Sequence, residues 1–219
     1  MDWRAPIDAY CERLGPGLWA EPLNALSNLG FVAAALWAAT QAWKYRTGIA
    51  VWVLVLLVLV IGVGSGLFHT FANRLAALAD VIPITLFIYF YLAFALRCFA
   101  RSGWGAVAAW LAGLFLVTLF MQNVTEPGFM NGSGAYVPAL IASLAVSLLL
   151  RRRGHEASHH LIIASSVLLI SLIFRTADQI ACPILPIGTH FIWHLLNAVV
   201  LALYLEAAIR FSPNGSRAR

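Results

Sequence analysis

Long apolar runs separated by short polar segments dominate the chain. Each run approaches the roughly 20 residues that an α-helix needs to cross a bilayer. The runs predict seven membrane-spanning helices, at Leu23–Trp43, Ala50–Phe68, Ala79–Phe99, Trp104–Met121, Ala135–Leu150, Leu161–Asp178 and Thr189–Ile209. Because the connecting segments are short, we expect an all-α integral membrane protein, a single seven-helix bundle over residues 1–210. Residues 211–219 are expected to form a disordered cytoplasmic tail.

Composition and charge support a membrane protein and indicate its orientation. Hydrophobic residues make up 62% of the 219 residues and charged residues only 11%, which excludes an ordinary soluble domain. The net charge of +5 is concentrated in alternate loops, at Lys44, Arg46, Arg97, Arg101, Arg151, Arg152, Arg153, Arg210, Arg217 and Arg219. The positive-inside rule places those loops in the cytoplasm, so the N-terminus is predicted outside and the C-terminus inside. The basic residues thus indicate orientation and no nucleic-acid partner.

Five polar residues lie inside or at the ends of the apolar runs, where an ionisable side chain is costly and is by default a functional candidate. They are Ser65, His69, Asp80, His190 and His194. The second predicted helix runs outward, whereas the third and the seventh begin outside. All five residues are therefore expected in the same outer layer of the bundle.

The spacing of these residues favours a catalytic metal, with zinc as the expected ion. His190 and His194 are four residues apart, so both side chains project from one helix face and can bind one ion. With His69 they make three protein ligands and leave a fourth position open, as in catalytic zinc sites that activate water. Asp80 would then accept the proton of the water, and Ser65 would stabilise the oxyanion.

Other interpretations of these residues stay open. Each histidine alone suits an interhelical hydrogen bond, and Ser65 between glycines suits close helix packing. The segment from His155 to His159 matches the HExxH zinc-protease pattern. However, it lies in a predicted cytoplasmic loop that offers no third ligand, so we interpret that match as chance.

Four groups of residues, in order along the chain, resemble the alkaline ceramidase family, within a superfamily of seven-helix membrane hydrolases that includes adiponectin-receptor-like proteins. They are Tyr10-Cys11-Glu12 with Glu21, Asn24, Ser27 and Asn28; Gly64-Ser65, Phe68-His69, Asp80 and Pro83; Asp178 with Cys182; and His190, Trp193, His194 and Leu195. The resemblance covers nearly the whole chain. It implies zinc-dependent hydrolysis of a ceramide-like N-acyl sphingoid base, a lipid taken from the membrane, to a fatty acid and the free base.

By the same resemblance His69, His190 and His194 bind the zinc, Asp80 orients or deprotonates the water, and Ser65 assists the oxyanion. The family also binds calcium near its N-terminus, which here implies ligands at Asp8, Glu12 and Glu21. Ala9 and Leu14, however, stand where the family offers a carboxylate and an amide. A solvated acidic segment without calcium is the alternative.

Two further pairs are expected from the predicted topology. Cys11 and Cys182 both fall on the outer side, where disulfides persist, so we expect a bridge between them, with free thiols as the alternative. Arg175 and Asp178 are three residues apart in one predicted helix and are expected to form a structural ion pair, with a direct role in catalysis as the alternative.

The alternatives to a ceramidase are a zinc-containing lipid receptor, a hydrolase of another acyl lipid, and a serine hydrolase built from Ser65, His194 and Asp80. The serine hydrolase is disfavoured because it leaves two histidines without a role. Short loops and the absence of retention signals suit a bacterial inner membrane with a periplasm-facing site. An ER or Golgi membrane with a lumenal site is the alternative, and no feature predicts a protein partner.

Overall fold

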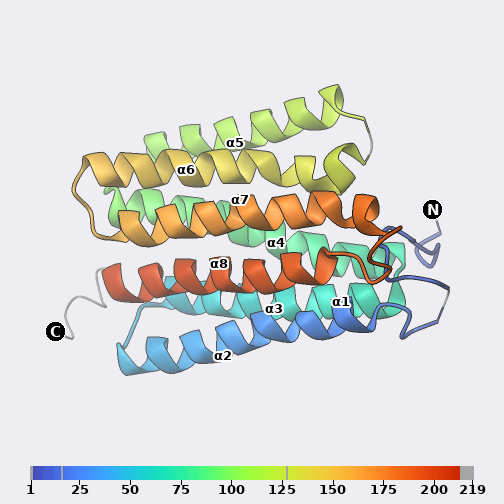
Figure 1. Ribbon diagram of the computed structural model, residues 1–219. Coiled ribbons are helices and arrows are strands. Elements are labelled where there is room, and N and C mark those ends of the chain that lie inside the picture. The colour runs from blue at the N-terminus through green and yellow to red at the C-terminus, as the bar shows by residue number, and fades with distance from the viewer. Residues whose placement is uncertain (1, 16, 127, 213–219) are drawn as a thin grey trace.

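The computed structural model describes residues 2–15, 17–126 and 128–212, and it shows long helices lying side by side in a bundle (Figure 1). The elements are α1 (Pro22–Ser27), α2 (Leu29–Lys44), α3 (Ile49–Phe71), α4 (Arg74–Phe94), η1 (Ala95–Phe99), α5 (Trp104–Val124), η2 (Phe129–Tyr136), α6 (Val137–Arg152), α7 (Ala157–Ala181) and α8 (His190–Phe211). Among the described residues these form seven helical segments long and apolar enough to cross a membrane. They confirm the predicted all-α bundle.

The observed helices extend beyond several predicted bounds. The third span begins at Arg74 rather than Ala79, because Asn73 caps α4 by accepting a hydrogen bond from the Ala76 amide at 2.9 Å. The last helix continues through Phe211, the first residue of the expected tail, whereas residues 213–219 lie outside the described part of the chain.

Small residues set the closest helix contacts, as expected where helices pack inside a membrane. A Cβ on Gly64 of α3 would collide with the backbone of Ala79 on α4, so glycine is required for this approach. A Cβ on Gly62 would meet Phe31 of α2 at 2.9 Å. These contacts bring the start of α2, the end of α3 and the start of α4 together.

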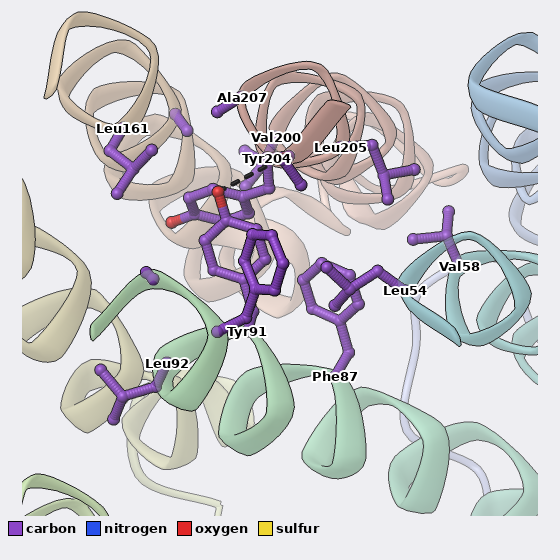
Figure 2. Packing of buried hydrophobic residues seen from close by; sticks show 14 of the residues in the cluster. Leu54, Val58, Phe87, Tyr91, Leu92, Leu161, Val200, Tyr204, Leu205 and Ala207 are labelled. Carbon is purple, nitrogen blue, oxygen red and sulfur yellow. Dashed lines mark hydrogen bonds between the residues drawn. The ribbon is translucent and has the colours of Figure 1, made fainter. Parts of the chain in front are cut away.

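Aromatic and aliphatic side chains fill the space between α3, α4 and α8 (Figure 2). The Tyr91 hydroxyl donates a hydrogen bond to the Tyr204 carbonyl at 3.1 Å, and the two rings lie 4.5 Å apart. Phe87 and Leu54 pack beside them, and both are buried. This apolar packing fixes α8, which carries two of the candidate histidines, against α3, which carries the third.

The N-terminal segment lies across the same end of the bundle as the α7–α8 connection, and the described C-terminal end of α8 lies at the opposite end (Figure 1). Backbone hydrogen bonds hold the segment there: Ile7 donates to Ala72, and Arg74 donates to Ala5. The segment therefore covers the end of the bundle that contains His69, the end of α3.

Candidate metal centre and active site

The three predicted histidines converge in the structure. His69 comes from the last turn of α3, and His190 and His194 come from the first two turns of α8. Their side chains are 1–2% exposed, and each offers a ligand nitrogen within 4.8 Å of the other two. Among the described residues, no other histidine, cysteine or acidic side chains form such a group. The geometry fits one metal ion bound by three imidazoles.

Hydrogen bonds from the N-terminal side orient two of the rings. His69 Nδ1 lies 2.6 Å from Glu21 Oε2, and His194 Nδ1 lies 2.7 Å from Ser27 Oγ. The Ser27 hydroxyl donates its only proton to the Asn24 carbonyl, so its oxygen must accept from His194. Both rings therefore carry their proton on Nδ1 and keep Nε2 free for a metal, as histidine ligands usually do.

Glu21 is almost fully buried and remains ionised. Burial alone opposes ionisation, but hydrogen bonds from His69, Arg13 and Asn24 outweigh it and hold the pKa of the Glu21 carboxyl below its ordinary value. A negative charge is thereby placed behind the ring of His69. This carboxylate would make the His69 imidazole a more basic ligand for a metal.

Asp80 and Ser65 face the same cavity as His190 and His194. Gly64 of α3 lies in close contact with the backbone of Ala79 on α4. Ser65 and Asp80 are the next residues on these two helices, so the contact places their backbones beside each other. Asp80 Oδ1 is buried, and no hydrogen-bond partner reaches it within the described residues. An acceptor of this kind beside three imidazoles is suited to take a proton from a reacting group.

Asp178 binds backbone amides at the start of α8, which is not the role that the sequence predicted for it. Its Oδ1 accepts hydrogen bonds from the backbone amides of Thr189 at 2.7 Å and His190 at 2.9 Å, and its Oδ2 accepts from Cys11 at 3.2 Å. Gly188, at a φ of +64°, lets the backbone pass directly against this carboxylate. The carboxylate thus caps the first turn of α8 and fixes the position of the His190 backbone relative to α7.

The predicted ion pair between Arg175 and Asp178 is wrong. No ion pair joins them in the described part of the chain, because Asp178 turns toward the backbone amides of the segment that follows α7. Arg175 instead lies among three aromatic rings, 5.8 Å from Tyr10, 5.4 Å from Tyr136 and 5.2 Å from Trp193. Its guanidinium lines the cavity beside the histidines.

Comparison with known families agrees with this geometry. The sequence model described as Ceramidase matches residues 10–214, nearly the whole chain. The chain belongs to the ceramidase family. The family acts on an amide by hydrolysis, and the resemblance carried by the four motif groups is confirmed. No protein of curated function matches the chain.

The structure contains the disulfide expected between Cys11 and Cys182, with Cα atoms 5.4 Å apart. It links the N-terminal segment to the end of α7, next to Asp178. Tyr10, directly before Cys11, stacks on His190 with ring centroids 3.8 Å apart. The disulfide therefore anchors a segment that is itself part of the wall around the histidines.

The acidic residues expected to bind calcium do not converge. Asp8 is exposed, and the Glu12 carboxylate caps α1 by accepting from the amides of Leu23 at 2.6 Å and Asn24 at 2.8 Å. Glu21 is paired with Arg13 and His69. Calcium takes six to eight oxygen ligands, so this arrangement of side chains does not fit it.

The HExxH match and Glu206 lie away from the site. His155 accepts a hydrogen bond from the Ala157 amide at the start of α7, which is the end of the bundle opposite the three histidines. No third ligand joins His155 and His159 in the described residues. Glu206 forms an ion pair with Arg210, four residues later on α8, at 2.6 Å.

Proposed function

We propose that this ceramidase is a zinc-dependent amide hydrolase that cleaves ceramide-like N-acyl sphingoid bases within the membrane. The observation that supports it most strongly is the buried group of His69, His190 and His194, of which His190 and His194 line an apolar cavity together with Asp80. Family membership supplies the amide as the bond to be cleaved. The products would be a fatty acid and a free sphingoid base.

The donor set favours zinc over harder cations. Three neutral imidazoles are a common ligand set of catalytic zinc, whereas calcium and magnesium prefer oxygen. His190 Nδ1 is buried without a hydrogen-bond partner among the described residues, and the other two rings are oriented by Glu21 and Ser27. Bound zinc would supply a Lewis acid and lower the pKa of a water.

Asp80 and Ser65 would carry the proton and the charge. The Asp80 carboxylate would accept a proton from the attacking water and later return it to the nitrogen of the departing sphingoid base. The Ser65 hydroxyl would donate a hydrogen bond to the oxygen of the amide as negative charge develops there. Both residues line the cavity, so neither would need to move far to reach the amide.

The shape and lining of the cavity suit a lipid chain. Beyond the polar residues, the lining consists mainly of apolar side chains from α3 to α8, among them Phe87, Leu114 and Leu161. A chain lying along these residues would bring the amide to the histidines and keep bulk water out. Such a cavity, apolar with a few convergent polar groups, is typical of a ligand site.

We also propose that the site faces outward. The basic residues at the ends of α2, α6 and α8 lie at the end of the bundle opposite the histidines (Figure 1). Under the positive-inside rule, that end is cytoplasmic. The histidines would then face the periplasm of a bacterial inner membrane, or the lumen if the membrane is that of the ER or Golgi.

The proposed function is tested by metal removal and a substrate panel. We expect purified protein in detergent to release fatty acid from one or more N-acyl sphingoid bases. Stripping the metal with a chelator should abolish release, and zinc should restore it, because the water is not activated without the metal. Fatty-acid release is measured by mass spectrometry. If the folded, zinc-loaded protein binds ceramide without turnover, the result would instead support the lipid receptor. If the protein cleaves only other acyl lipids, the result would identify a different substrate.

Arg175 should give the cavity affinity for a carboxylate. It is a fixed positive charge among the lining residues, and its Nε has no partner among the described residues. Under the proposed function, we expect Arg175→Met to weaken inhibition by free fatty acid about ten- to hundredfold, since a hydrogen bond to a charged group is worth about 1.5–3 kcal/mol.

The control for Arg175 is a ligand pair. Inhibition by a fatty alcohol of equal chain length should stay unchanged in Arg175→Met, because the alcohol has no charge. Inhibition constants for both ligands in wild type and variant give the comparison. Equal weakening for acid and alcohol would show that Arg175 only supports packing among Tyr10, Tyr136 and Trp193.

A further inference from the structure

Arg13 lies at the centre of the N-terminal segment as a buried cation surrounded by oxygens. Its side chain is 6% exposed, and its Nε lies 2.5 Å from Glu21 Oε1. Its Nη1 donates to the carbonyls of Gly15 at 3.2 Å and Gly17 at 3.4 Å. Its Nη2 donates to the carbonyl of His69 at 3.2 Å. One guanidinium thus contacts four oxygens.

These oxygens come from three separate parts of the chain. Gly15 and Gly17 belong to the loop before α1, Glu21 is the N-cap residue of α1, and His69 lies in the last turn of α3. A carboxylate and several backbone carbonyls gathered in this way are the ligands that a calcium ion takes. Here the Arg13 guanidinium, a cation that belongs to the chain itself, binds these oxygens, and its planar N–H donors point toward them.

A calcium ion would have no place beside this guanidinium. Glu21 already shares its two carboxylate oxygens between Arg13 and His69, and Asn24 donates to Oε2 as well at 3.2 Å. Glu12, the nearest acidic residue in sequence to Arg13, accepts from two backbone amides of α1. A divalent cation would have to break these bonds and would also be repelled by the positive charge of Arg13.

We propose that Arg13 is a built-in replacement for calcium, so that the metal centre of this ceramidase forms and works without calcium. Arg13 is a positioning residue. It holds the Glu21 carboxylate against His69 Nδ1 and, through the His69 carbonyl, the end of α3 that carries this ligand. The inference goes beyond amide hydrolysis, and of the proposed function it uses only metal binding by His69.

The consequence for His69 is specific. Removing Arg13 leaves Glu21 with His69 and Asn24 as its side-chain donors. It also removes the hydrogen bond from Arg13 Nη2 to the His69 carbonyl. Residues that orient a metal-ligating histidine typically change metal affinity about ten- to hundredfold when mutated. The expected loss in Arg13→Ala is a zinc affinity lower by that factor.

The first experiment measures calcium binding by the wild-type protein. Metal-free protein is reloaded with zinc and then equilibrated with calcium up to about 1 mM, the range in which extracellular calcium modules bind. We expect no stoichiometric calcium by elemental analysis and the same melting temperature with and without calcium. One calcium bound per chain, or a melting temperature that rises with calcium, overturns the proposal. Neither readout depends on hydrolysis, so a failure here is distinct from a failure of the proposed function.

The second experiment compares variants by zinc competition with a chromophoric chelator. Arg13→Ala should lose zinc affinity, and Arg13→Lys should fall between Ala and wild type, because lysine keeps the charge but cannot reach all four oxygens. Arg74→Ala is the matched control, since Arg74 is exposed at the same end of the bundle. Unchanged zinc affinity in Arg13→Lys and Arg13→Ala would refute the positioning role. If Arg13→Ala does not fold, the lysine variant and the wild-type calcium measurement still decide the matter.

Discussion

The His194→Ala variant should lose both bound zinc and amide hydrolysis. Two imidazoles would remain to bind the metal, and the Lewis-acid effect of a catalytic metal is worth several kcal/mol. Because each 1.4 kcal/mol changes a rate about tenfold, we expect hydrolysis to fall by about a thousandfold or more. Zinc content by elemental analysis and fatty-acid release from the preferred substrate are the two measurements.

His159→Ala serves as the matched control, because His159 belongs to the HExxH match at the opposite end of the bundle. It should keep zinc and activity at wild-type levels. His194→Ala is expected to remain folded, because its ring makes one side-chain hydrogen bond, to Ser27. A folded His194→Ala protein with full zinc and full activity would contradict the assignment of this residue as a ligand.

The spacing of chemical groups along helices was predictable from the sequence. His190 and His194 are four residues apart in one apolar run, and helical geometry puts them on one face whatever the tertiary packing. His69 could be added because alternation of basic loops fixed the relative direction of the helices. The Cys11–Cys182 disulfide followed from the same ordering, and the structure confirms it.

The roles of residues that bond to the backbone were not predictable. Asp178 is three residues from Arg175, which suggests a pair, but its carboxylate accepts from amides of residues 189 and 190, eleven and twelve positions later. Only the path of the α7–α8 connection, with Gly188 in a left-handed conformation, reveals those donors. A spacing rule within one helix cannot anticipate such contacts.

Glu21 and Arg13 show the same limit in the N-terminal segment. Acidic residues in a segment that resembles a calcium site suggested metal ligands, but Glu21 instead accepts hydrogen bonds from Arg13, eight residues earlier, from His69, 48 residues later, and from Asn24. A sequence pattern shows that a carboxylate is present and does not show which cation faces it. The segment outside the predicted spans thereby becomes part of the candidate metal site: Glu21 orients His69, and Tyr10 stacks on His190.

The Asp80→Asn variant should keep its zinc and lose most of its turnover. The amide of asparagine has nearly the shape of the carboxylate but cannot accept a proton, and a positioned general base contributes about 10²- to 10⁴-fold. Asp80 is not among the three residues that form the candidate metal group. We therefore expect kcat to fall by that factor while zinc stoichiometry and substrate KM stay near wild type.

Ser65→Ala separates proton transfer from charge stabilisation at the same place. Ser65 lines the cavity with Asp80, and loss of one hydrogen-bond donor to a developing oxyanion costs about 10²- to 10³-fold in kcat. A solvent deuterium isotope effect on kcat would distinguish the two roles. The isotope effect should diminish in Asp80→Asn, because the residual reaction no longer transfers a proton to this carboxylate. It should persist in Ser65→Ala. If Asp80→Asn instead loses zinc in proportion to activity, Asp80 supports the metal site rather than moving the proton, and the base must be sought elsewhere in the cavity.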